Sequence, residues 1–185
     1  MKKIPTLFER DWTGDRSRVV NQVHPGCEWV LAGEGVATRK IDGTNCEIQH
    51  GALWKRRELK PGEAAPPGFR LADRDETTGK TVGWLPVDAE APEDRYHREA
   101  FARLADRQDG TYELIGPRIQ GNPEGESQHR LVRHDPAALT LAGPVPRNFD
   151  GLRAYLADAD IEGIVWHHPN GSRAKLKKRD FGLKR

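Results

Sequence analysis

Short runs of apolar residues, or of alternating apolar and polar residues, recur along the chain between turn-forming residues. The pairs His50-Gly51 and Asn170-Gly171 predict two tight hairpins. Strands that outnumber helices and connect through hairpins indicate an α+β fold with antiparallel sheet. The strands are predicted at 28–32, 36–41, 44–49, 52–57, 111–115, 161–167 and 173–178.

Two segments show the spacing of an amphipathic helix. The first runs from 92 to 107, and Pro92 suits its first turn. The second is expected to begin at Asp150 as its N-cap, with Leu152 and Leu156 on its apolar face. Residues 61–68 are expected to form an exposed loop, and the polar stretch from there to about Pro92 has little periodicity apart from Thr81–Pro86.

The length of 185 residues predicts a single domain spanning 1–185. No apolar run reaches 18 residues, so no membrane contact is expected, and a monomer is favoured. Cys27 and Cys46 are too few for a disulfide framework or a zinc site. We expect both to be reduced and partly buried, which indicates a cytoplasmic protein.

The formal net charge is only +2, but the basic residues are unevenly placed. Residues 173–185 contain seven Lys or Arg and one acid, Asp180. Such a run is either a solvated surface or a surface that binds phosphates.

One short motif lies where the strand predicted at 36–41 ends. It reads Lys40-Ile41-Asp42-Gly43, or KxDG, and four further segments follow it in order: Trp54–Arg57, Tyr112–Gly116, Ile161–Val165 and Lys175–Lys177. The series resembles motifs I, Ia, III, IV and V of the covalent nucleotidyltransferases, which include ATP-dependent RNA and DNA ligases and mRNA capping enzymes. The resemblance covers residues 36–177 and implies the nucleotidyltransferase (ligase adenylylation) fold.

The resemblance makes Lys40 the nucleophile that attacks the α-phosphorus of ATP and retains AMP. The attacking amine must be uncharged, and the charge that develops on the phosphate needs fixed cations. Lys175 and Lys177 are the expected cations, since a spacing of two places both on one face of a strand. Gly43 suits a turn that brings backbone close to a ligand, and Asp42 either fixes that turn or contacts the nucleotide.

Three more residues are assigned by the resemblance. Glu113 should accept hydrogen bonds from the ribose hydroxyls, and Glu162 should help to position metal or nucleotide. Arg56 is favoured over Lys55 and Arg57 as the motif Ia cation, because a guanidinium can grip phosphate with two donors.

The turn at Asn170-Gly171 also predicts a register for the last hairpin. If these two residues form the loop, Glu162 and both lysines share one face of the hairpin. The expected cross-strand pairs are Trp166 with Lys175, Ile164 with Lys177, and Glu162 with Arg179.

Segments 40–46, 112–125 and 177–182 resemble, more narrowly, a family of small RNA ligases found in viruses, bacteria and animals, some implicated in RNA repair. Such enzymes use ATP and magnesium or manganese to join an RNA 5′-phosphate to a 3′-hydroxyl; no metal ligands are assigned here. Few residues follow Lys177, so no C-terminal OB domain is expected. RNA would then be gripped by a basic face of this domain, made of Arg118, Arg173, Lys178 and Arg179.

Other interpretations stay open at this point. They are a DNA ligase or capping-type nucleotidyltransferase, a non-catalytic nucleic-acid-binding module, and an enzyme that adenylylates something other than RNA. The family usually stacks an aromatic residue on adenine just after motif III, and residues 118–123 contain none. Ile119 and Trp166 are the alternatives for that role.

Overall fold

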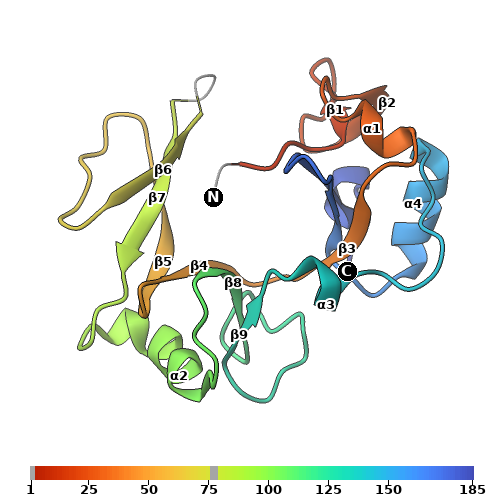
Figure 1. Cartoon of the computed structure of the whole chain (residues 1–185). Helices are drawn as coiled ribbons and strands as arrows, with labels where there is room; N and C mark the ends of the chain where they lie inside the picture. The colour runs from red at the N-terminus through yellow and green to blue at the C-terminus, as the bar shows by residue number, and fades with distance from the viewer. Residues whose placement is uncertain (1–2, 76–78) are drawn as a thin grey trace. The chain divides into compact units, whose positions relative to one another are not determined.

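A computed structural model describes residues 3–75 and 79–185 of the chain. It contains two compact units (Figure 1). Unit 1 consists of Lys3 and residues 42–134, and unit 2 consists of residues 4–41 and 135–185. The expectation of one domain over 1–185 stays a prediction. No helix in the described residues is long and apolar enough to cross a membrane.

Unit 1 is built on a six-stranded sheet (Figure 1). Its strands are β4 (Thr44–Gln49), β5 (Ala52–Leu59), β6 (Arg70–Arg74), β7 (Thr81–Pro86), β8 (Gly110–Ile115) and β9 (Arg130–Arg133). They lie in the order β6-β7-β5-β4-β8-β9, and every neighbouring pair is antiparallel. The short helix η1 (Pro92–Asp94) leads into α2 (Arg95–Arg103).

The core of unit 1 lies on one face of this sheet. Cys46 and Ile48 alternate with polar residues along β4, and Tyr112 and Leu114 do the same along β8. Period-two alternation therefore directs these four side chains to the face that Ala100 of α2 covers. The residues between them, including Asn45 and Glu113, belong to the opposite face.

Unit 2 combines two small antiparallel sheets with short helices (Figure 1). The strands are β1 (Phe8–Arg10), β2 (Val19–Val23), β3 (Val36–Lys40), β10 (Gly163–His167) and β11 (Arg173–Lys177). The helices are α1 (Glu28–Leu31), α3 (Pro136–Leu139), α4 (Phe149–Asp158) and η2 (Lys178–Phe181). β1 pairs with β2, and β10 lies between β11 and β3. Leu152 and Leu156 of α4 join Ile164, Trp166 and Leu176 in one buried cluster.

The expected α+β fold with antiparallel sheet and few helices is confirmed. The predicted strand at 28–32 is wrong, because residues 28–31 form α1. A short apolar run after a Pro-Gly turn suits a buried helical turn as well as a strand. The first predicted helix ends at Arg103 rather than 107, and Asn148 caps α4 in place of Asp150. Cys27 and Cys46 are free and buried, in different units.

Candidate active site

Lys40, Gly163 and Lys177 form one row across the three-stranded sheet of unit 2. Gly163 is the cross-strand partner of Lys40 on one side and of Lys177 on the other. Directly opposed residues present their side chains to the same face, and Gly163 has none. Lys40 and Lys177 therefore flank Gly163, which has no side chain, from its two neighbouring strands.

The apolar alternation of β10 and β11 determines which face carries these lysines. Ile164 and Trp166 in β10, with Leu176 in β11, are completely buried in the core of unit 2. By the pleat of the strands, Lys175 and Lys177 belong to the opposite face. Lys40 belongs to that face as well, because its partner Gly163 alternates with Ile164.

The register of this hairpin differs from the predicted one by a single residue. Val165 opposes Lys175 and Gly163 opposes Lys177, and the backbone N–H of Lys178 donates to the carbonyl of Glu162. The predicted pairs of Lys175, Lys177 and Glu162 are therefore wrong.

The physical reason lies in the loop of the hairpin. His168 pairs with Ser172, with 2.9 Å between the His168 nitrogen and the Ser172 carbonyl oxygen, whereas the predicted register pairs Ser172 with Pro169. Pro169 therefore joins the loop, which has three residues and ends at Gly171 with φ 89°. A three-residue loop with a left-handed residue in its last position is a common hairpin connection. The slip leaves both lysines on one face and gives them new partners.

Glu162 contacts Lys40 directly, although it precedes β10 rather than lying in it. The Lys40 ammonium and the Glu162 carboxylate form an ion pair, and their side chains are 24% and 16% exposed. The contact joins the predicted nucleophile to a partly buried acceptor.

Lys177 is held more tightly than a strand-end lysine on the surface would be. The residue is 7% exposed, and burial, with Arg179 nearby, lowers its side-chain pKa from the ordinary value. Its backbone N–H donates to Asp180 Oδ2 at 2.8 Å, and Asp180 Oδ1 accepts from Arg10 at 2.8 Å. The buried Asp180 thus fixes the end of β11 and the start of η2.

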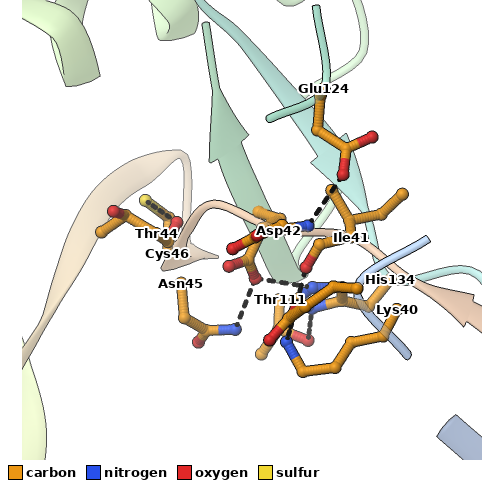
Figure 2. Close-up of polar contacts among 11 residues, drawn as sticks. Lys40, Ile41, Asp42, Thr44, Asn45, Cys46, Thr111, Glu124 and His134 are labelled. Atoms are coloured by element: carbon orange, nitrogen blue, oxygen red, sulfur yellow. Dashed lines mark hydrogen bonds and ion pairs between the residues drawn. The ribbon is translucent and has the colours of Figure 1, made fainter. Parts of the chain in front are cut away.

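The KxDG motif is divided between the two units. Lys40 and Ile41 belong to unit 2, and Asp42 and Gly43 belong to unit 1. A Cβ atom on Gly43 would lie 2.2 Å from the Leu114 carbonyl oxygen, so no side chain fits against β8 there. The Asp42 backbone N–H donates to Glu124 Oε1 at 3.0 Å (Figure 2). Glu124 therefore fixes the start of the turn, which is one of the two roles expected of Asp42.

Glu113 is a buried carboxylate on the polar face of the unit 1 sheet. The residue is 7% exposed. Its Oε2 lies 3.1 Å from His134 Nε2 and 3.3 Å from Asn45 Nδ2. His134 in turn contacts Thr111, as Figure 2 shows. His134 and Asn45 therefore hold in place the carboxylate that is expected to bind the ribose hydroxyls.

The three motif Ia cations have different surroundings. Lys55 pairs with the buried Asp94, and Arg57 pairs with Glu63 at the surface. Arg56 alternates with both along β5, so it belongs to the same face as Glu113. Its guanidinium lies 5.9 Å from the centre of the Trp84 ring. Burial lowers the pKa of Arg56, and the charges of nearby carboxylates, Glu113 among them, oppose that shift.

Three residues proposed for ligand contact are buried instead. Trp166 is completely buried in the core of unit 2, and Ile119 is 8% exposed in the core of unit 1. Neither presents a surface on which adenine can stack, so both alternatives are wrong. Lys178 is 7% exposed and cannot belong to an exposed basic face, whereas Arg118 and Arg179 are exposed.

No group of three or more His, Cys, Asp or Glu residues among 3–75 and 79–185 is arranged to hold a metal ion. Magnesium does not need such a cage, because it keeps most of its waters and binds through one or two carboxylates and substrate phosphates. Glu162, placed against Lys40, is a donor of that kind. The residues present therefore fit a magnesium ion carried with a nucleotide.

Sequence reasoning did not assign three residues that hold the candidate site residues in place. Asn45 and Glu124 lie within segments 40–46 and 112–125, which carry the family resemblance, so the sequence does mark these two residues. His134 lies 21 residues after Glu113, and no local pattern marks it. Only the pairing of β8 with β9 brings the two together.

Comparisons with known proteins point to one family. The family model described as RNA ligase 1 matches residues 90–185, just over half of the chain. An RNA ligase 1 from Danio rerio is 24% identical over 221 aligned residues, which cover 80% of this chain and 67% of that protein. An RNA ligase 1 from Pongo abelii is 31% identical over 90 residues, covering 43% of this chain and 26% of that protein. On these matches, the chain belongs to the RNA ligase 1 family.

Proposed function

We propose that this chain is an ATP-dependent RNA ligase with the nucleotidyltransferase fold. It would join an RNA 5′-phosphate to a 3′-hydroxyl through a covalent AMP on Lys40. The observation that carries the proposal is the row of Lys40, Gly163 and Lys177, read together with membership of the RNA ligase 1 family.

In the first step the Lys40 amine, having lost a proton to solvent, attacks the α-phosphorus of ATP. A nitrogen–phosphorus bond forms, the bond to the β-phosphate oxygen breaks, and pyrophosphate leaves. Glu162 holds the Lys40 ammonium in an ion pair before the proton is lost, and the neutral amine can then donate a hydrogen bond to the same carboxylate. A Cβ atom on Gly163 would lie 2.2 Å from the Leu176 carbonyl oxygen, so no side chain can stand between the two lysines that flank this position.

Lys177 and Lys175 counter the charge that develops on the phosphate oxygens. Both belong to the face that carries Lys40, and Asp180 holds the backbone of Lys177. A fixed cation stabilises the transition state more than a mobile one, because it needs no reorganisation during the reaction. Arg56 and Glu113 of unit 1 are proposed to contact the phosphates and the ribose hydroxyls, respectively.

In the second step the RNA 5′-phosphate oxygen attacks the AMP phosphorus, the nitrogen–phosphorus bond breaks, and Lys40 leaves as the amine after taking a proton from solvent. In the third, the 3′-hydroxyl loses its proton to solvent and attacks the RNA 5′-phosphorus, the bond to the AMP oxygen breaks, and AMP departs. Magnesium or manganese, when bound, would neutralise phosphate charge and activate the leaving groups. The cytoplasmic location and a role in RNA repair belong to the same proposal.

The test is intact-protein mass spectrometry after incubation with ATP and magnesium. The wild-type protein should gain one AMP, and Lys40→Ala should gain none. Lys60→Ala is the matched control, because Lys60 is an exposed lysine in a turn, and it should label normally. A folded wild-type protein that never gains AMP would exclude this mechanism.

A further inference from the structure

Two donors hold the same oxygen of the Glu113 carboxylate. His134 Nε2 lies 3.1 Å and Asn45 Nδ2 lies 3.3 Å from Oε2. The contacts found for this carboxylate within 3–75 and 79–185 involve Oε2, so Oε1 is left to accept a hydrogen bond from a ligand. The Glu113 side chain is 10% exposed, so these donors take the place of the water that would otherwise bind this oxygen.

His134 is itself fixed in one orientation. Its Nδ1 lies 3.1 Å from Thr111 Oγ1, and its backbone N–H donates to the Thr111 carbonyl at 3.0 Å. Figure 2 shows the ring of His134 with Thr111 at one nitrogen. When the Thr111 hydroxyl donates to Nδ1, Nε2 carries the proton and donates to Glu113. A histidine held at both nitrogens transmits its position to the carboxylate.

We infer that His134 is a positioning residue, which orients Glu113 so that Oε1 accepts from a ribose hydroxyl of the nucleotide. The inference rests on the proposed function and adds to it a residue that the motif series does not contain. The relay from Thr111 through His134 to Glu113 lies wholly in unit 1. Losing a hydrogen bond to a charged group would weaken nucleotide binding by about tenfold to a hundredfold.

The binding test uses α,β-methylene-ATP, which cannot transfer AMP, in titration calorimetry with magnesium. His134→Ala should bind it about tenfold to a hundredfold more weakly than wild type. His134→Gln should recover part of the loss, because its amide can donate to Glu113. His50→Ala is the matched control, since His50 is an exposed histidine of the same unit, with a side chain 86% exposed. Equal binding by wild type and a folded His134→Ala protein would overturn the inference.

Two further arms separate the inference from the proposed function. His134→Ala should no longer discriminate between ATP and the analogue that lacks the ribose hydroxyl bound by Glu113, tested with 2′-deoxy-ATP and 3′-deoxy-ATP. Imidazole ¹⁵N shifts should show the proton on Nε2 of His134, and Glu113→Gln should move these signals and leave those of His50 in place.

The outcomes can be told apart. A wild-type protein whose binding of the analogue is weakened by His134→Ala, but which never gains AMP, would refute the ligase mechanism alone. The positioning role alone would be refuted by three results together. The protein would gain AMP, the ¹⁵N signals of His134 would not move in Glu113→Gln, and His134→Ala would bind the analogue as tightly as wild type.

Discussion

Lys55 donates to Asp94 in unit 1, with 2.5 Å between Lys55 Nζ and Asp94 Oδ1, and the Asp94 side chain is 1% exposed. Asp94 also accepts from the backbone N–H of Asp88. The ion pair connects β5 to the start of α2. It also means that Lys55, one of the three cations in the motif Ia segment, already has a buried partner within the protein.

Replacing Lys55 by Met should therefore destabilise the protein. A buried carboxylate without its partner costs about 3 kcal/mol of unfolding free energy. Urea denaturation measures the change, and Lys55→Met with Asp94→Asn should recover part of it. Arg57→Ala is the control, because the side chains of its ion pair with Glu63 are 50% and 33% exposed, and the pair should contribute less than about 1 kcal/mol. Equal losses in Lys55→Met and Arg57→Ala would contradict the structural role.

Lys175 and Lys177 should act on the rate of AMP transfer. Each substitution by Met should slow adenylylation by about a hundredfold or more, or roughly 2.7 kcal/mol in barrier, because a fixed cation is lost. Met retains most of the side-chain volume, which matters for the buried Lys177. Single-turnover labelling with ATP measures the rate, and Lys184→Met, at an exposed position, is the control. Near-wild-type rates in both variants would leave these lysines without a catalytic role.

The stability of unit 1 should fall on acidification because of His97. Burial lowers the pKa of His97, and neither ring nitrogen has a hydrogen-bond partner among the described residues. Below the ordinary pKa of about 6.5 the unfolded chain binds a proton that the folded protein does not, so unfolding becomes easier until the folded pKa is reached. The free energy of unfolding should thus decrease as pH falls from about 6.5.

Urea denaturation of wild type and His97→Gln across this pH range checks the sign. The glutamine does not titrate, so the variant should lose less stability on acidification. The difference between the two proteins should stop changing above about pH 7.5. Parallel curves down to low pH would show that His97 titrates equally in both states.

Sealing should discriminate RNA from DNA. A protein distinguishes the two through 2′-hydroxyls or A-form geometry, and the attack by the 3′-hydroxyl depends on that geometry. Matched 5′-phosphorylated nicks, with RNA or DNA on the 3′-hydroxyl strand, and single-stranded RNA measure the preference. We expect sealing of RNA ends that weakens steeply with salt, because the phosphates dominate binding. Efficient sealing of all-DNA nicks alone would place the protein in another branch.

The strands were predictable where the apolar pattern alternates. Cys46 and Ile48 mark β4, and Ile164 and Trp166 mark β10, because one face of each sheet is buried. β6 and β9 were not predicted, since Arg70, Arg74, Arg130 and Arg133 give them little apolar character. The register of the last hairpin failed for a local reason, because Pro169 adds one residue to a loop that Asn170-Gly171 would otherwise form alone.

The roles of the motif residues came from family resemblance, and their surroundings came only from the fold. The sequence does not reveal that Lys55 is engaged by Asp94, 39 residues away, or that His134 reaches Glu113. Such contacts depend on strand pairing and helix packing across long separations. The order of the motif segments identifies the candidate site residues, and the pairing of strands determines which side chains each of them contacts.

The division of the KxDG motif has a practical consequence for dissecting this protein. The peptide bond between Ile41 and Asp42 is one of the places where the chain passes between the two units. If the protein were expressed as two fragments divided at this bond, each fragment would carry two residues of the KxDG motif and neither would carry the complete motif. Split-protein complementation at this bond would therefore ask whether catalysis tolerates a broken backbone two positions from its nucleophile. Circular permutants opened at an exposed hairpin such as His50-Gly51 would leave the motif intact.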